Sequence, residues 1–271
     1  AHRILHAELN TDQVAPSIGS KEIVAWLPII FGLTAQSVVA IPELAYPTYA
    51  VGAMMAHAEF VTYKNAYEIA ADTDLIWVNS PSNPTGEVLG VAELKAIIAR
   101  GREIGAPVVS DECYIELGWE AQPISILDPR VCDCDYSGIL AVHSLSKRSN
   151  LAGYRSGSVL GDSKLIADIV SLRKHSGMLV PTPIQMATIA ALGDDSHVQI
   201  QRELYAKRRE ILHNALVNAG FTVEHSQAGL YLWATNGKTC AETINWLAVR
   251  GILAAPGDFY GPQVLLMCAW P

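Results

Sequence analysis

Several features that would assign this chain to a class of protein are missing from its sequence. No run of about 18 apolar residues is free of charge, proline and glycine, so no membrane-spanning helix is predicted. The first residues, Ala1–Glu8, have no apolar core like that of a signal peptide. The five cysteines are scattered and lack the paired spacing of a structural zinc site. These absences predict a cytoplasmic protein with free thiols, no membrane partner and no bound metal.

Charge is also sparse, and it is mostly of one sign. Asp and Glu number 27 against 19 for Lys and Arg, and the net charge of −8 argues against a nucleic-acid partner. Half of the 271 residues are hydrophobic and only 17% are charged. Such a composition supplies a large buried core and gives no sign of disorder. The length fits one large domain or up to two ordinary ones.

The first two thirds of the chain alternate strands and helices. Helical spacing of apolar residues predicts a helix over Val91–Ile104, which Gly105 ends. A further short strand is expected over Gly157–Leu160. Four strands before it are short, almost wholly apolar and closed by polar or turn residues, as parallel strands covered on both faces are. They are Val38–Ile41, Asp74–Asn79, Pro107–Ser110 and Gly138–His143.

A second region begins near Ser196, and it predicts a smaller α+β domain. Its expected elements are a long helix over Val198–Ala219, strands over Phe221–Glu224 and Gly229–Ala234, a helix over Cys240–Arg250 and a strand over Ile252–Ala255. We therefore expect residues 1–195 to form a large domain and residues 196–271 a small one.

Polar side chains follow three of the predicted strands, where a ligand of an open α/β sheet binds. They are Asn83 after the second strand, Asp111 and Tyr114 after the third, and Ser144 and Lys147 after the fourth. Taken singly, each has an ordinary explanation as a solvated charge or a turn-forming residue. Their recurrence at successive strand ends favours one shared binding site.

The motifs around these residues resemble a known family. Ser80-Pro-Ser-Asn-Pro-Thr-Gly86, Ser110-Asp-Glu-Cys-Tyr114, His143-Ser-Leu-Ser-Lys147 and Leu151-Ala-Gly-Tyr-Arg-Ser-Gly157 occur in an order similar to that of fold-type I aminotransferases of class I/II. The resemblance covers roughly residues 18 to 262. The chain resembles in particular the actinobacterial N-succinyldiaminopimelate aminotransferases, through Pro42–Tyr49, Ser110–Tyr114, His143–Lys147 and Ala255–Pro262.

The resemblance implies a fold, a cofactor and a reaction. The expected fold is α/β, with a mostly parallel sheet sandwiched by helices and a smaller C-terminal α+β domain. The expected cofactor is pyridoxal 5′-phosphate (PLP), and the expected reaction moves an amino group between an amino acid and a 2-oxo acid such as 2-oxoglutarate. Family members work as homodimers, so a homodimer is expected here as well.

The resemblance also implies a role for each matching residue in holding the ring of PLP. Lys147 would bind the cofactor covalently as a Schiff base and then move protons. Asp111 would pair with the protonated pyridine nitrogen. Tyr114 and Asn83 would hydrogen-bond the phenolic oxygen of the ring. Tyr46 would stack on the ring face, although it could equally be ordinary core.

The phosphate of PLP would be held at a second group of residues. Arg155 and Ser144 would grip it, Arg155 as a bidentate fork. Gly19, Ser20 and Lys21 would present backbone N–H groups at the start of a helix. A plain helix cap is the alternative explanation of Gly19 and Ser20. Among the histidines, His143 shows no partner spacing and is expected to be structural.

Two departures from the family pattern bear on activity. Only about eighteen residues precede the phosphate-binding turn, where family members carry an N-terminal arm and a glycine loop. No arginine follows Arg250, although the family clamps the substrate carboxylate with one. A truncated or frame-shifted chain is therefore expected. Two alternatives stay open: another fold-type I enzyme such as a carbon–sulfur lyase, and a PLP-binding fragment without turnover.

Overall fold

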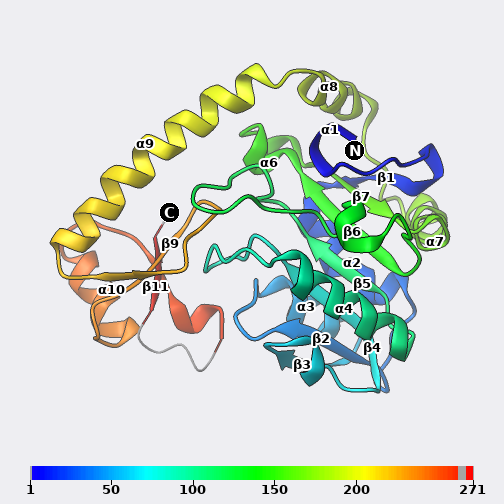
Figure 1. The fold of residues 1–271 in the computed structure, drawn as a ribbon, viewed down its shortest axis with the longest axis horizontal. Coiled ribbons are helices and arrows are strands. Elements are labelled where there is room, and N and C mark those ends of the chain that lie inside the picture. The colour runs from blue at the N-terminus through cyan, green and yellow to red at the C-terminus, as the bar shows by residue number, and fades with distance from the viewer. Residues whose placement is uncertain (1, 262–266, 271) are drawn as a thin grey trace.

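The computed structural model describes residues 2–261 and 267–270 (Figure 1). Within them, a seven-stranded sheet has the order β1-β7-β6-β5-β4-β2-β3. Its strands are β1 (Val14–Ile18), β2 (Val38–Pro42), β3 (Glu59–Tyr63), β4 (Thr73–Asn79), β5 (Val108–Asp111), β6 (Ile139–Ser144) and β7 (Ser156–Gly161). The surrounding helices are α1 (His2–Leu5), α2 (Gly19–Ile30), α3 (Thr48–Met55), α4 (Val91–Ile104), α5 (Pro129–Cys132), α6 (Leu145–Arg148), α7 (Ser163–His175) and α8 (Thr182–Gly193).

The predicted α/β fold is confirmed, and so is the direction of the four apolar strands. β2, β4, β5 and β6 run parallel to one another, while β7 is antiparallel to both of its neighbours. The predicted helix over Val91–Ile104 is α4 at the same bounds. Sequence patterns did not predict β1 and β3, the two edge strands. β1 contains Pro16 and has only two buried residues, and β3 is mostly exposed, so neither shows a buried apolar run.

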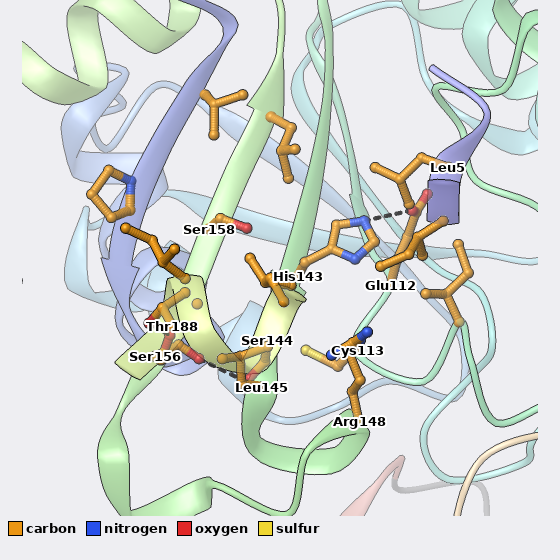
Figure 2. Close-up of a pocket in the computed structure, with 18 of the residues that line it drawn as sticks. Leu5, Glu112, Cys113, His143, Ser144, Leu145, Arg148, Ser156, Ser158 and Thr188 are labelled. Carbon is orange, nitrogen blue, oxygen red and sulfur yellow. Dashed lines mark hydrogen bonds and ion pairs between the residues drawn. The ribbon is translucent and has the colours of Figure 1, made fainter. Parts of the chain in front are cut away.

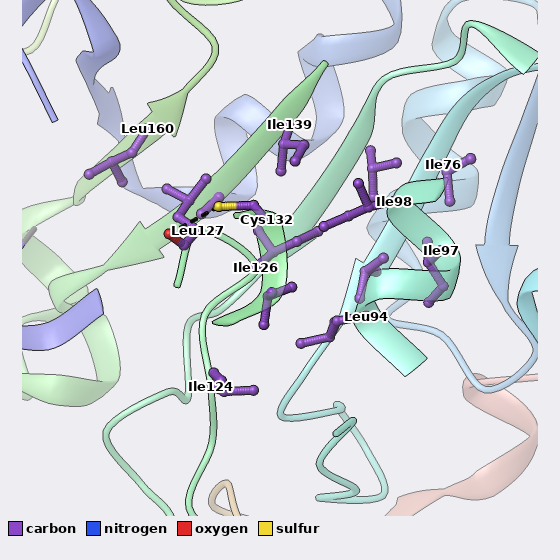
Figure 3. Close-up of a cluster of buried hydrophobic side chains, with 14 of the residues drawn as sticks. Ile76, Leu94, Ile97, Ile98, Ile124, Ile126, Leu127, Cys132, Ile139 and Leu160 are labelled. Atoms are coloured by element: carbon purple, nitrogen blue, oxygen red, sulfur yellow. Dashed lines mark hydrogen bonds between the residues drawn. The ribbon is translucent and has the colours of Figure 1, made fainter. Parts of the chain in front are cut away.

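Successive residues of the sheet alternate between two cores. Ile76, Val78 and Val108 point to one face, where Leu94 and Ile98 of α4 cover them (Figure 3). The residues between them point to the opposite face, which α2, α3 and α7 cover. On that side Ile23, Val24 and Leu27 of α2 are fully buried, spaced as one helical face. Burial of this kind stabilises by about 1.5–3 kcal/mol per large apolar side chain.

A smaller antiparallel sheet has the order β10-β11-β9-β8 within the described residues. Its strands are β8 (Thr222–Glu224), β9 (Leu232–Thr235), β10 (Ala255–Pro256) and β11 (Cys268–Trp270), and two helices accompany them, α9 (Ser196–Asn218) and α10 (Cys240–Ala248). The expected strand over Ile252–Ala255 is largely wrong. Only Ala255 is in a strand, and Leu253 before it is 86% exposed with no ladder partner in the described sheet.

Helices α8 and α9 cross from the large sheet to the small one (Figure 1). α8 is rich in apolar residues, yet none of its residues is buried, and Met186 and Ile189 are 60% and 64% exposed. α9 buries only Val198 and Leu216. No helix among the described residues is long and apolar enough to cross a membrane.

Candidate active site

The carboxyl ends of β4, β5 and β6 lie side by side and carry the predicted residues. Asn79 ends β4 and pairs in register with Asp111, which ends β5. The side-chain amide of Asn79 donates to the Asp111 carbonyl oxygen at 2.9 Å, and its oxygen accepts the backbone N–H of Asn83 at 2.7 Å. Asn79 therefore ties the Asn83 loop to the strand that carries Asp111. Sequence reasoning used Asn79 only as a strand end.

Asp111 is a buried carboxylate with a donor on each oxygen. Tyr49 of α3 donates its hydroxyl to Oδ2 at 3.1 Å, and the backbone N–H of Cys113 donates to Oδ1 at 3.2 Å. Burial raises the pKa of Asp111 above its ordinary value, while the hydrogen bonds from Cys113 and Tyr49 and the nearby His143 oppose that rise. Among the described residues, the groups around this carboxylate therefore do not fully offset the cost of its burial. A cationic ring nitrogen would supply an opposite charge.

Cys113 is the point around which three predicted residues gather. Burial raises the pKa of its thiol well above the usual value, and the charge of Asp111 adds to the rise. A hydrogen bond with Ser20 and the charge of Lys147 act in the opposite direction. Ser20 and Asp111, from two separate elements, thus hydrogen-bond one side chain, and the charge of Lys147 from a third element acts on the same thiol. Sequence reasoning treated Cys113 only as a free thiol.

Lys147 lies in the last turn of α6, directly beyond β6. Ser144 caps that helix, because its Oγ accepts the backbone N–H of Ser146 at 3.1 Å. The same Oγ contacts the carbonyl oxygen of Ser156 at 3.3 Å. The lysine side chain is half-buried on a short, capped helix.

Tyr114 is buried, with 6% of its surface exposed. Burial raises the pKa of Tyr114 well above its usual value, and Tyr231, which hydrogen-bonds it, adds to the rise. Tyr231 comes from the small-sheet region of the chain, so no local sequence signal could have paired the two. Asn83 is also buried, and its carboxamide oxygen has no hydrogen-bond partner among the described residues. Such an orphaned polar atom is expensive unless a ligand satisfies it.

A compact cradle forms where α2 begins. Gly19, at φ +69°, lies against the Arg155 guanidinium, and a Cβ placed on it would be 2.4 Å from Nη2. Arg155 donates from Nη1 to the Ala152 carbonyl oxygen at 2.9 Å and from Nη2 to the Ile18 carbonyl oxygen at 3.4 Å. The first N–H groups of a twelve-residue helix and a guanidinium thus converge. This geometry suits an anion such as phosphate.

Tyr46 lies between Lys21 and Tyr49. The Lys21 ammonium is 5.5 Å from the centre of the Tyr46 ring, and the Tyr46 and Tyr49 ring centroids are 5.9 Å apart with planes at 81°. Tyr46 lies in the loop before α3, and Tyr49 lies in the first turn of that helix. Tyr46 is half-buried and Tyr49 is fully buried.

A cavity of about 770 Å³ borders this group on one side. Cys113, His143 and Ser144 line it together with apolar residues from the N-terminal segment and α8 (Figure 2). His143 contacts Glu112 through Nε2 and Oε2 at 3.0 Å, so the histidine has a partner that its sequence spacing did not reveal. Glu112 is fully buried, and a structural role for His143 fits this contact.

Segment Ser226–Gly229 connects the site to the small sheet. On one side, Ser226 and Ala228 donate backbone N–H groups to the carbonyl oxygens of Thr85 and Gly86, at 2.7 and 2.9 Å. On the other side, Trp119 donates to Gln227 and Gly229 donates to Leu117, both at 2.9 Å. Gly86 must be glycine here, because a Cβ would lie 2.4 Å from the Ala228 oxygen. The segment thus contacts the loops after both β4 and β5.

The residues present fit PLP. Asp111 is a buried carboxylate whose burial the surrounding described groups do not fully offset, an anion cradle lies at the start of α2, and the charge of Lys147 acts on Cys113, which is hydrogen-bonded to Asp111. The buried Asn83 oxygen has no hydrogen-bond partner among the described residues and could accept a hydrogen bond from a ligand. Asn83 is linked to Asp111 only through Asn79 in the contacts of the described residues.

The family model and the relatives that match this chain all name aminotransferases. Residues 2–261 match the family "Aminotransferase class I and II". A probable aminotransferase of Mycobacterium tuberculosis is 53% identical over 97% of this chain and 63% of its own length. The 4-dedimethylamino-4-oxo-anhydrotetracycline transaminase of Streptomyces rimosus is 50% identical over 96% of this chain and 72% of its own length.

Solved structures agree on the fold. An aminotransferase from Staphylococcus aureus superposes with a TM-score of 0.90 at 23% identity, covering 99% of this chain and 75% of the other. A probable N-succinyldiaminopimelate aminotransferase from Thermus thermophilus gives 0.87 at 22% identity, covering 99% and 76%. The chain spans less than two thirds of the Mycobacterium tuberculosis relative's length. On this evidence, the chain belongs to the class I and II aminotransferases, a family of PLP-dependent transaminases.

Proposed function

We propose that this chain binds PLP and moves an amino group between an amino acid and a 2-oxo acid. The observation that carries the proposal is a buried carboxylate, Asp111, hydrogen-bonded to Cys113 together with Ser20 from the Gly19–Arg155 cradle, within the electrostatic reach of Lys147. When bound, PLP supplies an electron sink for the carbanion formed next to the amino group.

The site geometry supports a proposed role at the ring for each of these residues. Asp111 would pair with the ring nitrogen, because its burial makes an opposite charge favourable. Lys147 would hold the cofactor covalently and carry the proton at its Nζ. Tyr114 would donate its hydroxyl to the ring oxygen, because burial keeps the phenol protonated. The buried Asn83 amide would contact the same oxygen, and Tyr46 would cover the ring face.

The phosphate roles follow from the cradle. Arg155 would provide charge-assisted hydrogen bonds from its guanidinium. Gly19, Ser20 and Lys21 would donate backbone N–H groups from the first turn of α2. Ser144 would donate its hydroxyl, which lies at the start of α6.

We also propose the substrates, from the names of relatives. An LL-diaminopimelate aminotransferase of Dehalococcoides mccartyi is 32% identical over 94% of this chain. The name of this relative supports a diaminopimelate as donor. We propose N-succinyl-LL-2,6-diaminopimelate or a dicarboxylic amino acid as the donor and 2-oxoglutarate as the acceptor. The Streptomyces relative, by its name, acts on an oxo-anhydrotetracycline. A substrate panel should therefore contain both diaminopimelate derivatives and ring ketones.

The apolar surface of α8 supports a further part of the proposal, that the protein is a homodimer. Met186 and Ile189 are strongly exposed on a helix without a buried residue, and an exposed apolar surface of this kind is typical of an interaction site. A second copy would cover it. We also propose that residues 1–195 and 196–271 are the large and small domains, each with its own sheet. No disulfide joins the five cysteines, all of which lie in described residues, and this supports the proposal that the protein works in the cytoplasm.

The test is to add PLP, record visible absorbance, reduce with borohydride and identify the labelled peptide. The expected adduct is on Lys147, and Lys147→Ala should abolish it without loss of the fold. An adduct on Lys21, Lys164 or Lys174 would contradict the assignment. Keto-acid formation from each donor, with and without 2-oxoglutarate, then separates transamination from lyase chemistry.

A further inference from the structure

Asp111 is held by a residue that the proposed roles do not use. Tyr49 donates its hydroxyl to Oδ2 of Asp111 at 3.1 Å, and the Cys113 N–H holds the other oxygen at 3.2 Å. Tyr49 is fully buried, and Asp111 is 5% exposed. Water therefore does not compete for this contact, and a hydrogen bond to a buried charge is among the stronger ones.

The ring of Tyr49 is fixed on two sides. It stacks on Trp77 of β4 with centroids 4.9 Å apart and planes at 18°, and it meets the Tyr46 ring at 81°. Trp77 is itself fully buried. Because the Trp77 and Tyr46 rings pack against it, the Tyr49 ring keeps one orientation, with its hydroxyl toward Asp111.

The proton of this hydrogen bond belongs to Tyr49. Burial, followed by the charge of Asp111, raises the pKa of Tyr49 well above its usual value. Tyr49 is therefore a neutral hydrogen-bond donor at neutral pH. Its hydrogen bond lowers the pKa of Asp111, opposing the larger effect of burial.

We propose that Tyr49 is a positioning residue that holds the Asp111 carboxylate in one orientation and in its ionised form, so that Asp111 pairs with the cationic ring nitrogen of PLP. The inference rests on the proposed function of the site. Two tyrosines at the start of α3 then act on the same cofactor. Tyr46, in the loop before the helix, covers the ring, and Tyr49, three residues later in the first turn of α3, sets the charge beside the ring nitrogen.

Tyr49→Phe tests this, with Tyr63→Phe as a matched control. Tyr63 is another buried tyrosine, and its hydroxyl donates to the Trp77 carbonyl oxygen at 2.7 Å, away from Asp111. Both variants lose one buried hydroxyl, so both should lose thermal stability. Only Tyr49→Phe should weaken PLP binding, on the order of tenfold, which corresponds to about 1.4 kcal/mol. The NMR shift of the ring nitrogen in isotope-labelled bound PLP should also move toward the unprotonated value.

A pH series gives a readout that loss of packing would not change. The titratable groups facing Asp111 are Tyr49 from α3, Cys113 from the next turn and His143 from β6. Removing a donor raises the pKa of the carboxylate, so the ionised form needs a higher pH. The acid-side loss of PLP affinity should therefore begin at higher pH in Tyr49→Phe than in the parent or in Tyr63→Phe.

The outcomes separate the two proposals. If the parent chain binds no PLP, the proposed function fails and this inference fails with it. If the parent binds PLP and Tyr49→Phe matches Tyr63→Phe in affinity, ring-nitrogen shift and pH profile, Tyr49 is only structural. If circular dichroism shows Tyr49→Phe unfolded, 3-fluorotyrosine at position 49 replaces it. This stronger donor of similar size should move the acid limb to lower pH, and an unmoved limb would overturn the proposal.

Discussion

Gly19→Ala should separate phosphate binding from backbone strain, because the chain contains a matched control at the other end of the same helix. Gly19 begins α2 at φ +69°, and Gly32 follows the end of α2 at φ +72°. Alanine in this left-handed region costs about 1–2 kcal/mol at either position. Only at Gly19 does the new Cβ meet anything, since a Cβ at Gly32 has no atom within 4 Å among the described residues.

The collision sets the size of the effect. The Gly19 Cβ would lie 2.4 Å from Arg155 Nη2, and ordinary contact begins at 3.4 Å, so the guanidinium must withdraw by about 1 Å. That movement disturbs the charge-assisted contacts proposed for the phosphate. Such contacts contribute about 1.5–3 kcal/mol, which corresponds to about 10–150-fold in the dissociation constant for PLP.

The assay compares PLP with pyridoxal, which has the same ring and no phosphate. Urea unfolding should show similar destabilisation of Gly19→Ala and Gly32→Ala. Absorbance titrations should show that Gly19→Ala loses most of the preference for PLP over pyridoxal, whereas Gly32→Ala keeps it. If both variants keep the same preference, the cradle at Gly19 and Arg155 does not bind the phosphate, and the assignment of both residues is wrong.

Three further predictions concern charges. Asp111→Asn should weaken PLP binding and slow the half-reaction with an amino acid by orders of magnitude, and rapid-mixing absorbance that shows an undiminished rate would contradict this role. Burial raises the pKa of Asp111, so the folded chain holds the Asp111 proton more tightly than the unfolded chain does. The contribution of Asp111 to the free energy of unfolding should therefore fall as pH rises above 3.8. Urea unfolding of the PLP-free protein at several pH values should show a smaller fall in Asp111→Asn than in the parent, and parallel curves for the two proteins would refute this. Arg173→Met leaves the Glu22 carboxylate, 14% exposed, without its ion-pair partner at 3.0 Å, and the free energy of unfolding should fall by about 3–5 kcal/mol, whereas a loss below about 1 kcal/mol would show that the pair is dispensable.

The strands that could be predicted are those buried on both faces. β4 and β6 read as unbroken apolar runs, so their residues and the polar groups that follow them were visible in the sequence. The edge strands β1 and β3 expose much of their length and lack that signal. The predicted strand over Ile252–Ala255 was largely wrong, because only Ala255 and Pro256 pair with β11.

The candidate site shows the same division between local and distant contacts. Asp111, Lys147 and Asn83 could be proposed because each follows a strand in a recognisable motif. Asn79, Tyr49 and Tyr231 act through hydrogen bonds to residues distant in sequence, and only the folded chain brings them together. Cys113 lies inside one of the sequence motifs, but its hydrogen bond with Ser20 and the influence of the Lys147 charge depend on the packing of three elements.

The segment Ser226–Gly229 has a mechanical consequence. Its backbone is bonded to the loop of Asn83 on one side and to the loop after Tyr114 on the other. A displacement of β8 and β9 must either break these bonds or carry both loops along. A movement of the small sheet therefore displaces Asn83 and Tyr114, the two side chains proposed to contact the ring oxygen, and it moves their two loops together rather than separately.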